Sequence, residues 1–437
     1  MTYRLFSWEH SYFSGKARAY LRYKQRMGGL EEGFEDILAT PELMLGLLAQ
    51  KSGSGAVPQL EAPDGTWVQD TCEIIDFCEA RHPEPVVSPD PATHPRQAVV
   101  SYLIELLADE WMVVPGFWER WFFSEDGREP SHRGANEQTW GAVFAAGQAG
   151  DVRRAAGARL FEQDFGIARS RSDPVGVYAG LVHLGVNDET ERAWQASQHR
   201  ILGLLEAHFS VHDYVLGGRP SLGDFGLMGP LYAHLYRDAV SGFALRTHFP
   251  LVCEWVERTN GEGALNARTY DQKLYSLGPG GELIGRPANS DGAAWLPDDT
   301  VPESLLPVVA VFFEEMWPVL VSAIERLTAF IASDAHEPGS KLPGKTFFAD
   351  PGFGDVQRGD GPLTHEYSLG GVSGRRMVVP YQVWMLCRLE KVLARADRQP
   401  LETLLEKIPN GASLLGLGEL LAGCRVVRQD ARLYSVG

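Results

Sequence analysis

The stretch SYFSGKARAYLRYK (residues 11–24) is the key to the first part of the chain. It follows Tyr3–Trp8, whose alternating, aromatic-rich pattern predicts a β-strand. From Ser14 to Gln25 apolar residues recur at three- and four-residue steps, which predicts a helix. The two segments therefore form a β–α unit with hydroxyl side chains at its junction.

A second strand–helix pattern follows in AVPQL (residues 56–60) and DGTWVQDTCEIIDFCE (residues 64–79). Val57–Leu60 reads as a short strand, Asp64-Gly65 as a tight turn, and Thr66–Gln69 as the returning strand. Asp70 then falls where the N-cap of the next helix is expected. The order β-α-x-α-β-β-α is that of a thioredoxin-like α/β domain.

Read together, these three stretches resemble the N-terminal domain of glutathione S-transferases. A Val-Pro pair or an Asp-Thr helix start is common by itself, so the order and spacing of the motifs make the resemblance specific. The resemblance implies that glutathione is the co-substrate and that a small hydrophobic electrophile is the second partner.

The resemblance also implies which residues bind glutathione. In that family the proline after valine is cis, which would leave the Val57 backbone free to pair with the cysteinyl backbone of glutathione, and Pro58 becomes a site residue with it. Thr71, at the start of a helix, would hold the γ-glutamyl carboxylate. Asp70 would help to hold the γ-glutamyl ammonium group. The alternative for Asp70 is that it only caps the helix.

Ser11 is the predicted catalytic residue. It stands at the first position of the family's Ser/Cys-x-x-Ser/Cys stretch, where a hydroxyl that donates a hydrogen bond to the glutathione thiolate favours the anion. Tyr12 and Ser14 are the alternates at this junction. The absence of cysteine at Ser11 and Ser14 argues against mixed-disulfide chemistry. The competing interpretation is that Ser11 or Ser14 simply caps the helix.

Composition excludes several other classes of protein. The chain has 437 residues, of which 44% are apolar, so it can bury a large core and divides into more than one domain. Its net charge of −17 argues against nucleic acid and anionic membranes as partners. No apolar signal segment opens the sequence, and the five scattered cysteines are typical of a reduced, cytoplasmic protein. His208 and His212 lie four apart, but no further ligand completes a set, so no metal is predicted.

Proline-rich residues 83–95 predict a linker between the α/β domain (residues 1–82) and an all-helical domain (residues 96–277). Within the latter, Ser221 and Asp224 stand at capping-box spacing, as in the buried helix of the transferase C-terminal domain. By the same resemblance, an aromatic-rich segment faces the cleft and lines the second-substrate pocket with Trp111, Trp118 and Arg120. Core packing is the alternative role for each of these aromatic residues.

Residues 278–437 exceed a usual transferase and predict an additional, mainly helical C-terminal region, hereafter the extension. Gly278–Asp299 reads as a linker. The apolar stretch Leu305–Val321 is too interrupted by Pro307, Pro318 and two glutamates to span a membrane, and Leu305–Ile331 predicts a long helix that Pro318 must kink or interrupt. The extension either covers the cleft or replaces a dimer surface, and a homodimer is compatible with the resemblance. The predicted function is glutathione-dependent conjugation or thiolytic cleavage. A non-catalytic binding or scaffold protein of the same fold is the alternative.

Overall fold

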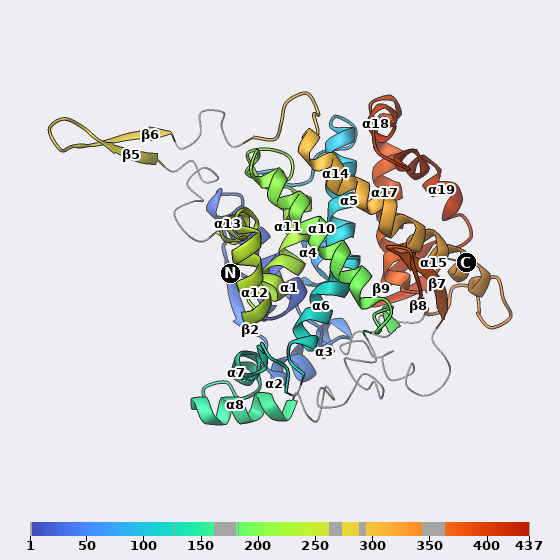
Figure 1. The fold of residues 1–437 in the computed structure, drawn as a ribbon, viewed down its shortest axis with the longest axis horizontal. Helices are drawn as coiled ribbons and strands as arrows, with labels where there is room; N and C mark the ends of the chain where they lie inside the picture. The colour runs from blue at the N-terminus through green and yellow to red at the C-terminus, as the bar shows by residue number, and fades with distance from the viewer. Residues whose placement is uncertain are drawn as a thin grey trace.

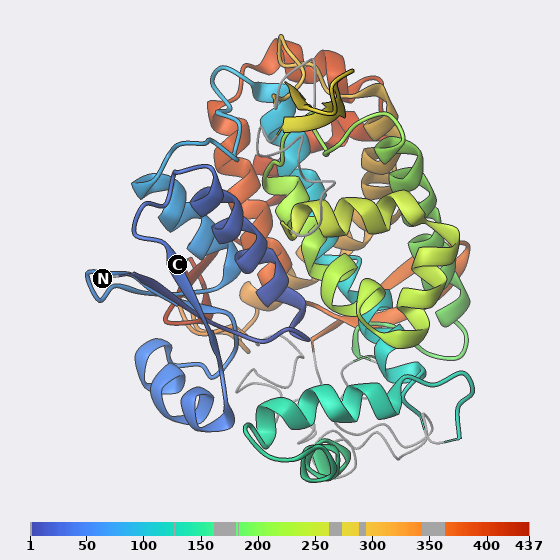
Figure 2. The ribbon, with the colours of Figure 1, turned by 90° about the vertical axis from the view of Figure 1, so that its left-hand side faces the viewer.

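The computed structural model of the chain describes residues 2–125, 127–160, 181, 183–261, 273–287, 294–342 and 363–436. An α/β domain comes first, a helical domain follows, and the extension packs against both (Figures 1 and 2). This order agrees with the fold class expected from the sequence.

The α/β domain is built on a four-stranded sheet with the strand order β2-β1-β3-β4. Strands β1 and β2 are parallel, and the other neighbours are antiparallel. The elements are β1 (Tyr3–Ser7), α1 (Tyr12–Arg26), β2 (Phe34–Leu38), α2 (Pro41–Leu43), a π-helical turn (Met44–Leu48), α3 (Ala49–Ser52), β3 (Gln59–Glu61), β4 (Trp67–Gln69) and α4 (Thr71–Arg81). The predicted β-α-x-α-β-β-α order is confirmed, with strand ends shifted by one residue or two.

Strand register brings three loops to one end of this sheet. Phe6 of β1 pairs with Gln59 of β3, and Gln59 pairs in turn with Gln69 of β4. The carboxyl ends of β1 and β4 therefore lie beside the amino end of β3. The predicted site residues Ser11, Val57 and Asp70 follow or precede these strand ends directly.

The helical domain surrounds one buried helix, α11 (Leu222–Pro230), which packs against α1 and α5. Ser221 and Asp224 form the predicted capping box at its start, and Asp224 also accepts hydrogen bonds from the Val215 backbone and Trp255 Nε1, both at 3.0 Å. The other elements are α5 (Pro95–Glu110), α6 (Val113–Phe122), α7 (Arg133–Phe144), α8 (Gly150–Arg159), α10 (Glu191–Phe209), a π-helical turn (Leu231–Tyr236), α12 (Ala239–His248) and α13 (Pro250–Thr259).

The segment expected to be only a linker contains part of a β-hairpin instead. Strands β5 (Lys273–Leu277) and β6 (Leu283–Pro287) pair in antiparallel register, and the hairpin projects from the rest of the protein (Figure 1). Gly281 adopts a φ of 83° in the connecting turn, a conformation that glycine reaches without strain. The glycine-rich run therefore forms a turn between strands, and β5 begins before the predicted end of the helical domain.

The first helix of the extension is continuous, so Pro318 does not interrupt it, although a π-helical turn precedes this proline. Its segments are a 3₁₀ turn (Glu303–Leu305), α14 (Leu306–Val311), a π-helical turn (Phe312–Met316) and α15 (Trp317–Ile331). Pro307 stands in the first turn of this helix, where the missing N–H costs little. Pro318 lies inside the helix and directly follows the π-helical turn, a local change in the hydrogen-bond pattern of the kind that accommodates an interior proline. By length and composition, the helix Glu303–Ile331 alone among the described residues could cross a membrane. However, 61% of its most apolar window is buried in the protein, as expected for a core helix.

The rest of the extension covers α4 and α5. Helix α17 (Pro380–Arg395) packs along α5, Arg388 forms an ion pair with Asp76 of α4 at 2.9 Å, and Met385 Sδ lies 3.6 Å from Cys72 Sγ. The remaining elements are β7 (Thr364–Leu369), β8 (Val372–Met377), α18 (Arg398–Leu405), a 3₁₀ turn (Gly411–Gly416), α19 (Leu417–Leu420), β9 (Val426–Gln429) and β10 (Arg432–Ser435). The helices agree with the mainly helical extension predicted from the sequence, whereas the β9–β10 hairpin was not predicted.

Candidate active site

The Val57-Pro58 peptide is cis, as the sequence predicted. Pro58 is buried and Val57 is half-buried. Within the described residues, neither the N–H nor the carbonyl of Val57 takes part in a hydrogen bond. A half-buried backbone pair of this kind usually has partners, so it can pair with an extended ligand as a further strand would.

Asp70 and Thr71 form the start of α4, as expected. The Asp70 carboxylate accepts a hydrogen bond from the Cys72 backbone at 3.0 Å and so caps the helix. Its φ of 94° is unusual for a residue with a side chain; such strain costs about 1–3 kcal/mol and is characteristic of functional sites. Thr71 is only 3% exposed, and no described residue forms a hydrogen bond with its hydroxyl.

Of the three hydroxyls at the β1–α1 junction, only that of Ser11 is partly exposed. Ser11 Oγ accepts a hydrogen bond from the Ser14 backbone at 3.2 Å, so it does cap α1, but its own proton remains available to donate. Ser14 is fully buried and accepts from the Trp8 backbone at 3.2 Å. Tyr12 is buried and donates to the Ala108 carbonyl at 2.5 Å, and burial raises its pKa far above the ordinary value. This geometry favours Ser11 over its two alternates.

The extension covers the Asp70–Thr71 end of the site. The Tyr381 hydroxyl donates to the Asp70 carboxylate at 2.7 Å. Arg428 of β9 donates to the Gln69 carbonyl at 3.2 Å and also contacts the side chains of Gln69 and Glu73. Thr71 is therefore enclosed in this structure, whereas Ser11 and Val57 keep some exposure.

The residues predicted for a second-substrate pocket are packed into the core. Trp111 has no exposed surface, stacks on Trp194 at a ring-centroid distance of 4.4 Å and donates to Ser197. Trp118 is buried against Phe122. Arg120 is buried and tied to three partners: the Asp238 carboxylate at 2.8 Å, the His10 carbonyl at 2.7 Å and the Ala233 carbonyl at 2.5 Å. The structure gives all three side chains packing contacts, so a pocket role for them stays a prediction.

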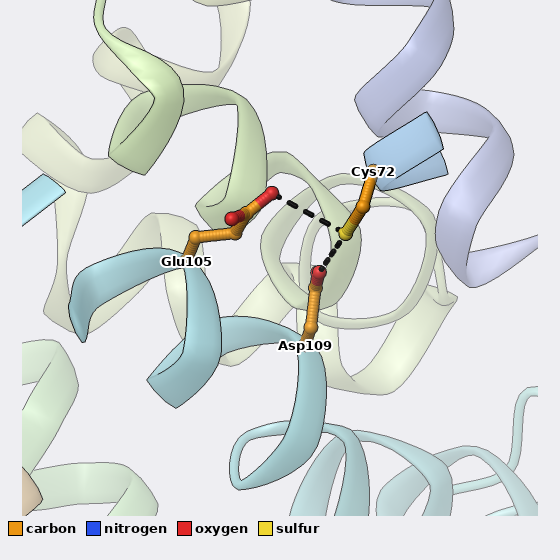
Figure 3. Close-up of side chains that lie close together, drawn as sticks. All are labelled: Cys72, Glu105 and Asp109. Atoms are coloured by element: carbon orange, nitrogen blue, oxygen red, sulfur yellow. Dashed lines mark hydrogen bonds between the residues drawn. The ribbon is translucent and has the colours of Figure 1, made fainter. Parts of the chain in front are cut away.

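A buried cluster of charged side chains lies next to the first turn of α4, and it was not predicted from the sequence. The Lys16 ammonium of α1 contacts Glu105 at 2.7 Å and Asp109 at 2.6 Å, both on α5, and lies 3.5 Å from Cys72 Sγ of α4. Figure 3 shows the side chains of Cys72, Glu105 and Asp109 pointing toward one another. These three side chains could ligate a metal ion, but the ion would have to displace the ammonium group. We therefore interpret the cluster as an ion-pair network that joins the two domains.

Burial controls protonation in this cluster. It raises the pKa of Asp109 to about 7, although Lys16 acts in the opposite direction, and it raises the pKa of the Cys72 thiol well above the ordinary value. Cys72 is therefore a protonated thiol rather than a nucleophile. The sequence did carry a signal: Glu105 and Asp109 stand four apart, and so on one face, in a largely apolar stretch of the helix.

The raised pKa of Asp109 predicts a pH dependence of stability. In the folded protein Asp109 holds its proton up to about pH 7, whereas in the unfolded chain it loses it near pH 4. Its contribution to stability is therefore complete below about pH 4 and is lost as the pH rises through 7. Urea unfolding between pH 4 and 8 should show this slope, and Asp109→Asn should remove it. An unchanged slope in Asp109→Asn would assign the dependence to another group.

Comparison with known families agrees with this architecture. The family model for the glutathione S-transferase C-terminal domain matches residues 181–262. No curated protein matches the sequence significantly.

Several solved structures are similar to part of the chain. A glutathione S-transferase from Rhodospirillum rubrum is 17% identical, and the match covers 61% of this chain and 91% of that one, with a TM-score of 0.36. A beta-etherase from Sphingobium sp. strain SYK-6 is 19% identical, with coverages of 61% and 98% and a TM-score of 0.38. A glutathione S-transferase from Methylobacillus flagellatus with bound glutathione is 14% identical, with coverages of 61% and 99% and a TM-score of 0.37.

The family match covers the region that contains the capping box and the buried helix α11. It follows an α/β domain that has the expected strand order, a cis Val57-Pro58 peptide and a helix capped by Asp70. Residues 181–262 therefore match the C-terminal domain of glutathione S-transferases, the family that the N-terminal motifs also resemble.

Proposed function

We propose that the protein binds glutathione between the β1–α1 junction, Val57 and the start of α4, and uses its thiolate to attack a small apolar electrophile. The observation that carries the proposal is the unpaired Val57 backbone beside a cis peptide. The cysteinyl backbone of glutathione would supply the missing donor and acceptor. Because the three loops meet at one end of the sheet, the same ligand can also reach Ser11, and it reaches Thr71 once Tyr381 and Arg428 move aside.

The proposed chemistry depends on the thiol of glutathione being ionised. A free thiol has a pKa of about 8.5, so little thiolate is present at neutral pH. The Ser11 hydroxyl would donate a hydrogen bond to the thiolate sulfur and stabilise that form. The sulfur then bonds to the electrophilic atom of the second substrate. Either the adduct is the product, or a leaving group departs with the electron pair of the bond that breaks.

A second candidate function is glutathione or ligand binding without catalysis. The contacts of Tyr381 with Asp70 and of Arg428 with Gln69 favour it, because they enclose the end of the site that would hold the γ-glutamyl group. Turnover of glutathione with a generic electrophile, such as chlorodinitrobenzene, separates the two functions. Turnover above the uncatalysed rate supports the transferase, and glutathione binding without turnover supports the binding protein.

The position of the extension also bears on oligomeric state. Helix α17 occupies faces of α4 and α5, which supports the alternative in which the extension replaces a dimer surface. Sedimentation velocity distinguishes the resulting monomer from a homodimer.

Thr71→Ala should weaken glutathione binding by about 1–3 kcal/mol, the cost of leaving a buried carboxylate short of one donor. Isothermal titration with glutathione measures the change. The control is Thr66→Ala, because Thr66 is exposed in the turn between β3 and β4. This variant should bind glutathione as the wild type does. Equal affinity in Thr71→Ala and the wild type would place the γ-glutamyl group elsewhere.

A further inference from the structure

Arg376 on β8 points into the protein because of strand register. It pairs across the hairpin with His365 of β7, and the inward positions of β7 are His365, Tyr367 and Leu369. The neighbouring Arg375 lies on the outer face, where it is exposed and donates to Thr364 Oγ1 at 2.7 Å. Two adjacent arginines thus occupy opposite faces, and an apolar residue would be expected at the inner one.

The guanidinium of Arg376 is buried, and no described residue forms a hydrogen bond with it. The residue is 1% exposed, and none of its three guanidinium nitrogens has a hydrogen-bond partner among the described residues. The Glu110 carboxylate, at the end of α5, acts on it electrostatically but forms no hydrogen bond with it. Buried charges are normally paired, because removing an ion from water carries a large penalty. The unmet donors therefore indicate a ligand that supplies acceptors.

His365 adds one unmet acceptor beside these donors. The Ser322 hydroxyl donates to the Glu366 carbonyl at 2.9 Å, so the proton in its 3.0 Å contact with His365 comes from His365 Nδ1. His365 Nε2 is then an acceptor, and it too is buried with no hydrogen-bond partner among the described residues. Burial and Arg376 lower the pKa of His365 to about 3, which keeps the ring neutral.

The surrounding contacts place Arg376 next to the predicted second-substrate region. The Tyr367 hydroxyl accepts a hydrogen bond from Trp194 Nε1 at 2.9 Å and donates to the Gly185 carbonyl at 2.5 Å. Trp194 packs on Trp111, which directly follows Glu110 at the end of α5. The inner face of the β7–β8 hairpin therefore lies against the aromatic residues of the helical domain.

We propose that Arg376 binds an oxyanion, a carboxylate or a phosphate ester, carried by the second substrate. The planar guanidinium donates two parallel hydrogen bonds to such a group, and His365 Nε2 accepts from a protonated oxygen beside it. That the oxyanion belongs to the second substrate rests on the proposed function. The oxyanion subsite itself does not require glutathione.

The test measures binding of two probes, benzoate and phenyl phosphate, to the full chain without glutathione. Titration calorimetry on the wild type should show binding of at least one probe, and the tighter probe assigns the class of oxyanion. Arg376→Met should weaken that probe about 10- to 100-fold, the loss expected for hydrogen bonds to a charged group. Arg375→Met is the matched control on the outer face and should bind as the wild type does.

Thermal unfolding distinguishes a ligand-binding arginine from a structural one, because the two roles predict opposite changes in melting temperature when Arg376 is replaced. Removing an unpaired buried charge should raise the melting temperature of Arg376→Met without ligand, whereas the probe should raise that of the wild type. If Arg376→Met fails to fold, Arg376→Lys is measured in its place. It keeps the charge and should bind the probe more weakly than the wild type does. The proposal is overturned if the wild type binds neither probe, or if wild type and both Arg376 variants bind them equally. If the wild type binds a probe but does not bind glutathione, the proposed function is contradicted and the oxyanion subsite is still supported.

Discussion

Ser11→Ala should lower glutathione turnover with a generic electrophile about 100-fold near neutral pH and leave the affinity for glutathione almost unchanged. The reason is that the Ser11 proton is donated to the thiolate and not to the rest of the tripeptide. Each unit by which the pKa of the glutathione thiol rises corresponds to about 1.4 kcal/mol. The measurements are steady-state rates as a function of pH, together with glutathione titrations of the same variant.

Two neighbouring variants control for effects on the fold. Ser14→Ala should lower stability, because it leaves the Trp8 backbone without its acceptor, yet it should change turnover less. Tyr12→Phe removes a hydrogen bond to Ala108 in the core. Full activity in Ser11→Ala, with activity lost in either of the other two, would move the catalytic hydroxyl to Tyr12 or Ser14. An unaltered rate in all three would favour the non-catalytic function.

Lys16→Met should lower the free energy of unfolding by about 3–5 kcal/mol, the usual cost of breaking a buried ion pair from one side. The variant leaves the Glu105 and Asp109 carboxylates buried with no cation in contact, since Lys16 is the only described residue that forms an ion pair with either. Denaturant unfolding followed by far-UV circular dichroism measures the loss.

The control for Lys16 neutralises the whole cluster. A triple variant with Lys16→Met, Glu105→Gln and Asp109→Asn carries no buried charge at these positions, so it should recover most of the lost stability. A loss in Lys16→Met below about 1 kcal/mol, the scale of an exposed pair, would mean that the cluster contributes little to the domain interface.

The α/β domain could be predicted from sequence because its signals are local. The strand before Ser11, the turn at Asp64-Gly65 and the cap at Asp70 each depend on a few adjacent residues, and their spacing limits the topology. The capping box of α11 is local in the same sense. The site residues followed from that order, and the cis Val57-Pro58 peptide agrees with it.

The contacts of the extension could not be predicted in this way. Tyr381 and Asp70 are 311 positions apart, and a helix pattern shows which face is apolar but not which surface it will cover. Lys16 of α1 likewise meets Glu105 and Asp109 only after α1 and α5 have packed together. The turn in the expected linker was missed because a glycine-rich run between two short strands resembles a flexible connection.

The most direct test of the central claim is a crystal structure of the protein soaked with glutathione. The account predicts that the cysteinyl backbone pairs with the N–H and carbonyl of Val57, that the sulfur lies within hydrogen-bond distance of Ser11 Oγ, and that the γ-glutamyl carboxylate meets Thr71. It also predicts that Tyr381 moves away from Asp70 or contacts the γ-glutamyl group itself. Glutathione bound elsewhere, or a Val57 backbone that stays unpaired at saturating glutathione, would contradict the account.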